Sequence, residues 1–176
     1  MNLEINTTIT YQNQNDSPSR TTIHYGGTRS GKSYALLQWI IVKCLEGKED
    51  VVIVRKTIPS LKRTIVKDFE DIMSSLELWN ANDFNQTDRI YSFYTGSTIS
   101  FISTDNPEKL RGLKSSILWL EEANEIDEES WFQLRIRCTG AIILSLNPTI
   151  SPHHWIRAIE DCTTYFTTFN NNHIKS

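Results

Sequence analysis

Apolar and polar positions along the chain alternate in a way that predicts strands and helices in turn. Short runs rich in β-branched and aliphatic residues, typical of buried parallel strands, predict most of the strands. The strands are expected at residues 22–25, 51–54, 117–120, 141–146 and 163–169. Apolar residues at helical spacing predict helices at residues 32–45, 59–76, 128–138 and 152–160. The pattern is that of an α/β protein with a largely parallel central sheet flanked by helices.

Two further features complete the predicted order of elements. Residues 89–94 and 97–104 are rich in Ile, Phe, Tyr and Thr, and Thr95 and Gly96 join them, which indicates an antiparallel β-hairpin. Residues 1–21 are expected to form an extension, with a short strand at 5–11 and a polar loop after it. The core is then expected to run from residue 22 to residue 176.

Composition limits the classes of function. The chain has 176 residues, the size of one domain, and no apolar run approaches the ~18 residues that a membrane helix needs. Its net charge of −3 is unlike that of a protein that binds nucleic acid over its whole surface, so any DNA contact must be local, intermittent or built by several subunits together. The cysteines, Cys44, Cys138 and Cys162, lack metal-ligand spacing and are expected to be free thiols.

A phosphate-binding loop follows the first core strand. The segment fits the pattern G-x-x-x-x-G-K-[ST], and a helix is predicted directly after it. Its residues are Gly26, Gly27, Thr28, Arg29, Ser30, Gly31, Lys32 and Ser33. Glycines allow backbone amides to turn around a phosphate, and the helix N-terminus adds positive potential. Lys32 is expected to reach the β- and γ-phosphates of ATP, and the Ser33 hydroxyl to ligate Mg²⁺.

Arg29 lies inside this loop and leaves two interpretations open. Its guanidinium can reach the γ-phosphate and stabilise charge in the transition state. It can equally be a loop residue that faces solvent.

Adjacent carboxylates end the predicted strand at residues 117–120. Nucleotide hydrolysis needs one acid near the metal and a second acid that orients the attacking water. Glu121 and Glu122 are expected to supply these groups on a strand beside that of the phosphate loop, with Glu121 toward Mg²⁺ and Glu122 toward water. Because glutamate is longer than the commoner aspartate, we expect Glu121 to contact the metal through water.

The next strand also ends in polar residues. Ser145 and Asn147 can sense the γ-phosphate and pass its loss to neighbouring segments, although Asn147 before Pro148 can simply start a turn. Arg111 precedes the glutamate strand, where an exposed arginine can enter a neighbouring subunit's site or remain solvated.

Together these segments resemble the ATPase domain of phage terminase large subunits, the motors that drive DNA into capsids. Besides the phosphate loop and the hairpin, the resemblance rests on segments 54–61, 106–113, 120–126, 145–148 and 152–156. It implies a RecA-like P-loop fold of the additional-strand catalytic-glutamate class. It also implies that Glu122 is the catalytic glutamate, that residues 145–148 couple hydrolysis to DNA movement, that Arg29 is functional, and that Arg111 acts in trans.

The resemblance further implies partners. These are ATP with Mg²⁺, double-stranded DNA, the portal protein, the small terminase subunit and a homomeric ring, expected to be a pentamer, in the host bacterial cytoplasm and docked on the procapsid. The family's C-terminal nuclease domain has no counterpart here, so nuclease activity is not expected. Alternatives are another P-loop motor, such as a helicase or partition ATPase, and a nucleotide-binding subunit that docks on a capsid without turnover.

Overall fold

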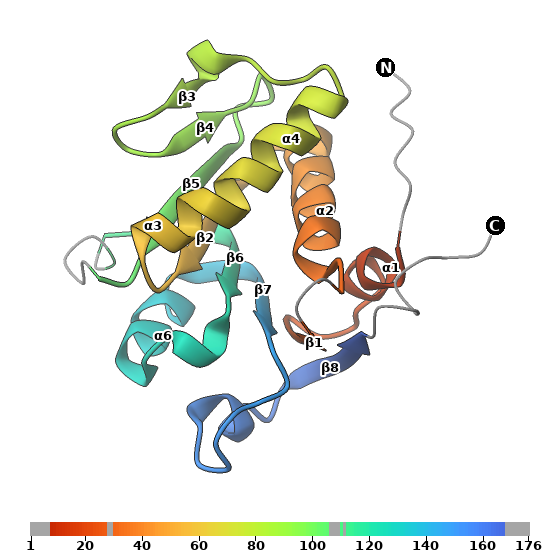
Figure 1. The fold of residues 1–176 in the computed structure, drawn as a ribbon, viewed down its shortest axis with the longest axis vertical. Coiled ribbons are helices and arrows are strands. Elements are labelled where there is room, and N and C mark those ends of the chain that lie inside the picture. The colour runs from red at the N-terminus through yellow and green to blue at the C-terminus, as the bar shows by residue number, and fades with distance from the viewer. Residues whose placement is uncertain (1–7, 28–29, 106–109, 111, 168–176) are drawn as a thin grey trace.

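The computed structural model describes residues 8–27, 30–105, 110 and 112–167. One eight-stranded sheet, in the order β3-β4-β5-β2-β6-β7-β1-β8, runs through the molecule with helices on both faces (Figure 1). No helix among these residues combines the length and the apolar character that crossing a bilayer requires. The sheet and its flanking helices confirm the predicted α/β class.

Most neighbouring strands of the sheet are parallel. β1 pairs with β7 and β8, β2 pairs with β5 and β6, and β6 pairs with β7, all in parallel. The bounds are β1 Thr21–Gly26, β2 Asp50–Arg55, β5 Thr98–Ser103, β6 Ser115–Glu121, β7 Cys138–Leu146 and β8 Cys162–Thr167. Because these strands share one direction, the residues that follow them meet at a single edge, which we call the carboxyl edge.

The antiparallel part lies at one side of the sheet. β4 (Ile90–Ser92) pairs antiparallel with β5, as the predicted hairpin requires, and β3 (Phe84–Asn85) adds a short outer strand. A 3₁₀ turn, η2 (Ala81–Asp83), leads into β3. The positive φ of Gly96 (84°) forms the hairpin turn, a conformation that glycine adopts without strain.

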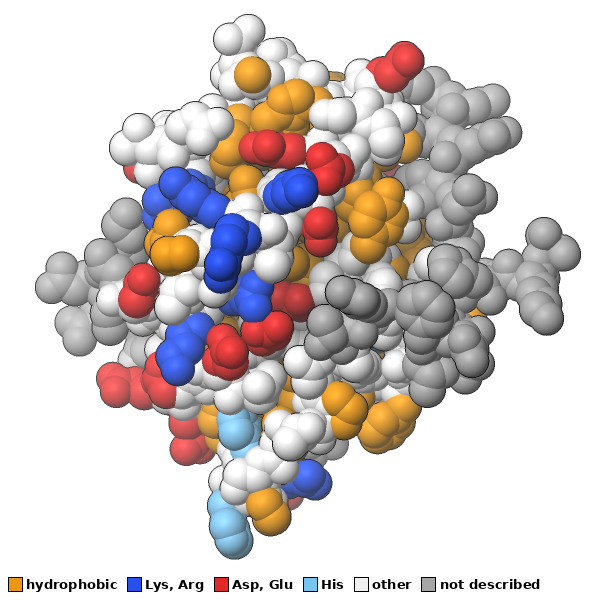
Figure 2. Space-filling view, viewed as in Figure 1, with side chains coloured by type: hydrophobic (Ala, Val, Ile, Leu, Met, Phe, Trp, Pro, Cys, Tyr) orange, Lys and Arg blue, Asp and Glu red, His pale blue; other side chains and the backbone are white. Residues whose placement is uncertain are grey.

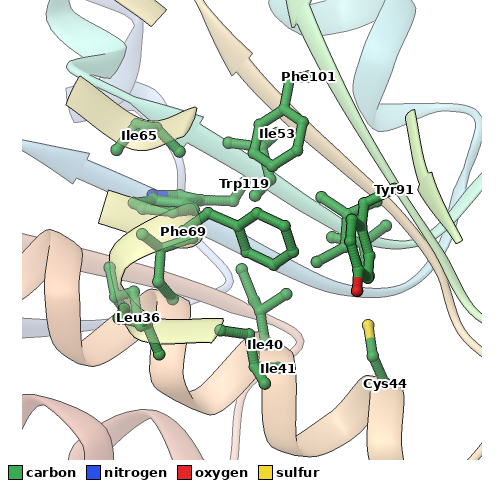
Figure 3. Packing of buried hydrophobic residues seen from close by; sticks show 14 of the residues in the cluster. Leu36, Ile40, Ile41, Cys44, Ile53, Ile65, Phe69, Tyr91, Phe101 and Trp119 are labelled. Carbon is green, nitrogen blue, oxygen red and sulfur yellow. The ribbon is translucent and has the colours of Figure 1, made fainter. Parts of the chain in front are cut away.

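The first face of the sheet carries the larger core. α2 (Lys32–Glu46) and a long helix built from α3 (Ile58–Leu61), the π-helical η1 (Lys62–Val66) and α4 (Lys67–Ser75) pack on it. Figure 3 shows Phe69 among Ile40, Tyr91, Phe101 and Trp119. These side chains are almost fully buried. Alternation along each strand sends Ile53 and Trp119 into this core and their neighbours to the other face.

The opposite face is covered by α6 (Glu128–Arg135). Trp131 and Leu134 of this helix pack against Val54, Leu118 and Leu144. Asp127 caps the helix by accepting a hydrogen bond from the Ser130 amide at 2.8 Å. The short 3₁₀ turns η3 (Ala123–Glu125) and η4 (Trp155–Ala158) lie beside it, and the indole Nε1 of Trp155 donates to the Ile126 carbonyl at 2.8 Å.

The expected strand at residues 5–11 is wrong in the part that the structure describes. Residues Ile9–Asn15 form helix α1 instead, because the Thr8 hydroxyl caps it and Tyr11 packs against the core beneath α2. The expected helix at 152–160 is only the single turn η4, and the helix expected to reach residue 138 ends at Arg135.

A second correction concerns the order of strands. The glutamate strand was expected beside the strand of the phosphate loop, but β7 lies between β1 and β6. Both sides of β7 are paired, with Ile23 opposite Leu144 on one side and Leu120 opposite Leu144 on the other. Sequence order does not reveal such an insertion, because β7 follows both of its neighbours in the chain.

α1 is anchored to β1 through a buried histidine. The Gln14 side-chain oxygen accepts a hydrogen bond from Thr22 Oγ1 at 2.7 Å and lies 2.9 Å from His24 Nε2. His24 is completely buried and stacks on Tyr165. Burial, with a smaller contribution from Lys32, lowers the pKa of His24 from its usual 6.5 to about 4.

We expect stability to fall on acidification through His24. The folded state disfavours the charged imidazole. Between pH 6.5 and about 4, His24 is therefore protonated in the unfolded chain and neutral in the folded chain. The loss in unfolding free energy is about 3 kcal/mol at the acid end. Denaturant melts from pH 7 to pH 4.5 should show the decline, and His24→Gln should flatten it. An equal pH slope in parent and variant would contradict the assignment.

Candidate functional site

The phosphate loop connects β1 to α2 at the carboxyl edge. A Cβ atom at Gly26 would lie 2.7 Å from Ser30 Oγ and 3.0 Å from the Thr167 carbonyl, so a larger residue there would have to displace Ser30 and press on the Thr167 backbone. Gly31 has a φ of 76° and occupies the N-cap of α2. Gly31 has no side chain with which to cap the first amides of the helix, and a helix start of this kind favours an anion.

Lys32 and Ser33 are the first residues of α2. Lys32 is buried and lines a cleft of about 300 Å³. The cleft lies between the phosphate loop, the ends of β2 and β6, and the π-helical segment. It is lined by Ser30, Gly31, Lys32, Ser33, Tyr34, Arg55, Thr64, Ile65, Asp68, Glu121, Glu122 and Asn147.

Glu121, the last residue of β6, lies at the floor of this cleft. Its Oε1 accepts a hydrogen bond from Ser33 Oγ at 2.6 Å, and its Oε2 accepts one from Ser145 Oγ. Ser145 also accepts a hydrogen bond of 2.8 Å from the indole Nε1 of the buried Trp119. This network fixes the Glu121 carboxyl in place from three elements: β6, β7 and α2.

Burial dominates the chemistry of Glu121. Desolvation raises the pKa of its carboxyl, while the ammonium of Lys32 and the hydroxyls of Ser145 and Ser33 oppose the rise. A cation bound beside it would therefore stabilise the charged form.

A magnesium ion fits the donor atoms of this cleft. Ser33 Oγ and the Glu121 carboxylate are adjacent oxygen donors, and Mg²⁺ is commonly bound by one or two such groups plus substrate phosphates and water. In the part of the chain that the structure describes, no three His, Cys, Asp or Glu side chains gather to hold a metal by themselves.

Glu122 leaves the strand in a different direction from Glu121. Its backbone is left-handed, with φ 51° and ψ 52°, a conformation that is unfavourable by about 1–3 kcal/mol for a residue with a side chain. The turn keeps the Glu122 side chain partly exposed, at 28%, and places it in the cleft. Adjacent glutamates thus occupy different environments, one buried and one open to solvent.

Arg55, at the end of β2, holds Glu122. Its Nη2 forms an ion pair with Glu122 Oε2, and its Nη1 donates to Thr64 Oγ1 at 2.7 Å. Thr64 Oγ1 in turn donates to the Ser60 carbonyl at 2.8 Å. Thr64 lies in the π-helical segment, and such turns occur often at functional sites. Arg55 was expected only as part of the segment 54–61, although a charged residue that ends a buried parallel strand is itself a signal for a site.

The other predicted site residues are placed as follows. Asn147 follows β7 and lines the cleft, and among the described residues its side-chain oxygen is buried without a hydrogen-bond partner. Ser145 is fully buried behind Glu121 and does not line the cleft. Thr28, Arg29 and Arg111 lie outside the described residues.

We expect Arg55→Gln to slow ATP hydrolysis without weakening nucleotide binding. Glu122 would lose its partner, and charged hydrogen bonds of this kind correspond to about a tenfold to hundredfold effect on rate. Arg55→Lys should not rescue the rate, because one ammonium cannot replace a planar fork that spans Thr64 and Glu122. Turnover and nucleotide titration of both variants test this positioning role. A fall in affinity that matched the fall in rate would indicate structural damage instead.

Comparison with known proteins begins with a family model. The model of the phage terminase large subunit family matches residues 19–169 of this chain. A search of curated proteins found no match.

Solved structures share the fold. The large terminase of a thermophilic bacteriophage superposes with a TM-score of 0.78 at 13% identity, over 94% of this chain and 46% of that chain. The same phage's large terminase in complex with ATP-γ-S gives 0.71 at 15% identity, with 94% and 46% coverage. The Thermus phage P74-26 large terminase ATPase domain gives 0.62 at 15%, with 89% and 79% coverage. The RecA-like fold is therefore confirmed, and the chain spans about half the length of the first of these proteins.

Proposed function

Since the chain belongs to the phage terminase large subunit family, we propose that it is an ATPase that powers the movement of double-stranded viral DNA into a procapsid. One observation carries the proposal. The phosphate loop, a buried acid bonded to Ser33, and a second acid open to solvent share one cleft. Support for a nucleotide ligand comes from the large terminase of the thermophilic bacteriophage, which was solved with ADP and with ATP-γ-S.

The phosphate loop binds the triphosphate in this proposal. Amides at the start of α2 and the Lys32 ammonium take the β- and γ-phosphates, where the negative charge is greatest. Ser33 and Glu121 would hold Mg²⁺, which supplies charge neutralisation between the phosphates. Contact between Glu121 and the metal through water, expected from the length of the side chain, remains part of the proposal.

Glu122 acts on the attacking water. Its carboxylate lies in the same cleft as Lys32 and Ser33, and its partial exposure gives water access to it. As a general base it accepts a proton from the water while the water oxygen bonds to the γ-phosphorus, and the bond from that phosphorus to the β-phosphate oxygen breaks to release ADP. Arg55 orients the Glu122 carboxylate, and Asn147, which lines the same cleft, would sense the γ-phosphate together with Ser145.

Arginines are proposed to complete the site. Arg29, inside the phosphate loop, would stabilise charge on the γ-phosphate, and Arg111 would act on the nucleotide of a neighbouring subunit in a ring. The remaining proposed partners are the portal and the small terminase subunit. The proposed place of action is the procapsid in the bacterial host.

The decisive experiment measures ATP hydrolysis against protein concentration, with and without Mg²⁺, duplex DNA and portal. We expect Mg²⁺-dependent turnover that rises faster than linearly with concentration, because Arg111 would act in trans, and that DNA and portal increase further. Nucleotide binding without turnover under every condition would favour the capsid-docking subunit over the motor.

A further inference from the structure

Cations are concentrated in one short segment of this acidic chain. Residues 55–67 contain five of its Lys and Arg side chains and no Asp or Glu, although the net charge of the whole chain is −3. Arg55 turns inward to Glu122. The other four, Lys56, Lys62, Arg63 and Lys67, are exposed. We call these four side chains the basic surface.

The π-helical segment shapes the basic surface. In η1 the hydrogen-bonded turn is wider than in an α-helix, so side chains five positions apart, such as Lys62 and Lys67, lie closer to the same side. Ile65 and Val66 of the same segment are buried in the core. Figure 2 shows blue side chains gathered over this part of the molecule, with red side chains next to them.

The exposed cations of η1 and α4 form no ion pairs with the described acidic residues, so they can contact a ligand. Among the described residues the ion pairs are Lys43–Glu46 and Arg55–Glu122, so none involves the basic surface. Burial and the charge of Asp71 raise the pKa of the neighbouring Asp68, and the Lys67 charge only opposes this rise; Lys67 forms no ion pair with that carboxylate. Along the chain, the first acidic residue after Arg55 is Asp68, directly after Lys67.

We propose that the basic surface contacts the phosphate backbone of double-stranded DNA. The inference rests on the proposed function, which supplies DNA as the partner. A local group of cations also explains how a chain with a net negative charge can contact DNA. Exposed Lys and Arg side chains attract phosphates without reading the base sequence. Lys62 and Lys67 lie one wide turn apart on the same side of the helix, where both can meet phosphates of one strand.

The surface also adjoins the hydrolysis site. Thr64, between Arg63 and Lys67, bonds to the guanidinium that holds Glu122. DNA on the basic surface would therefore contact the same helical segment that lines the nucleotide cleft.

The test measures binding of random-sequence duplex DNA by this chain across salt concentrations. For Lys62→Gln/Lys67→Gln we expect weaker binding and a slope of log affinity against log salt that is shallower by about 2. The matched control, Lys43→Gln/Lys48→Gln, removes as much charge at the far end of α2 and should keep the parent slope. ATP-γ-S binding should be unchanged in all three proteins, because none of these lysines lines the cleft.

Other outcomes separate this proposal from the proposed function. Equal losses in both double variants would mean a general charge effect and would overturn the assignment of the surface. An unchanged slope in Lys62→Gln/Lys67→Gln, with a parent that binds DNA, would overturn the surface and leave the DNA motor standing. A parent that hydrolyses ATP but binds no duplex DNA, alone or with portal, would count against both. Loss of portal binding alone would identify a protein partner instead of DNA.

Discussion

Glu122→Gln should abolish ATP hydrolysis and leave ATP binding intact. The amide keeps the size of the carboxylate but cannot accept a proton from water, and general-base catalysis typically contributes about 10²–10⁴-fold to the rate. The hydrogen bond between Ser33 and Glu121 does not involve Glu122. Single-turnover hydrolysis and titration with a fluorescent ATP analogue measure the two properties separately.

A neighbouring glutamate provides the control. Glu125 is exposed, follows Glu122 by one short turn and does not line the cleft, so Glu125→Gln should hydrolyse ATP at the parent rate. ATP hydrolysis at the parent rate by Glu122→Gln would contradict the assignment of Glu122 as the general base. Loss of ATP binding in the same variant would show that the charge serves the nucleotide and not the water.

Lys32→Ala should lose most of its affinity for triphosphate. Lys32 is the buried cation at the start of α2, where the loop and the helix N-terminus converge. Removing hydrogen bonds from a charged donor to phosphate costs about 1.5–3 kcal/mol, which weakens binding by about tenfold to a hundredfold or more. Calorimetry with ATP-γ-S measures the loss directly.

The Lys32 variant also has a consequence for Glu121. The Lys32 charge holds down the raised pKa of the Glu121 carboxyl, so its removal should raise that pKa further and favour the protonated acid. Mg²⁺ binding in the presence of nucleotide should then require higher pH than in the parent protein. Lys48→Ala, at an exposed position just beyond the C-terminal end of α2, should change neither property. Unchanged ATP-γ-S affinity in Lys32→Ala would mean that the loop is not the triphosphate site.

Local patterns were sufficient for most elements and for the main site residues. Strands β2 and β6 contain continuous apolar runs, which are typical of parallel strands that are buried on both faces. The phosphate loop is equally local, because a strand, glycines and a helix start must follow one another within a few residues. For the same reason Lys32, Ser33, Glu121 and Glu122 could be placed at one edge of a parallel sheet before any fold was known.

Weak local signals were decided by packing. Residues 9–15 form α1, in which Gln14 contacts Thr22 and His24 of β1. The helix propensity of the segment alone does not predict this contact. Residues 152–160 form only one 3₁₀ turn because hydrogen bonds from the side chains of His154 and Trp155 to the backbone of Asn124 and Ile126 fix that segment.

The sequence by itself determined which residues can carry the chemistry, since a loop that binds phosphate and acids that end a strand are defined within a few positions. Only the tertiary structure decided how these acids differ. It buried Glu121 between Ser33 and Ser145 and turned Glu122 into the cleft on a left-handed backbone. It also brought Arg55, which Thr64 holds, to the Glu122 carboxylate. The physical reason is that strand order and side-chain burial depend on contacts between segments far apart in the chain, and no local pattern records them.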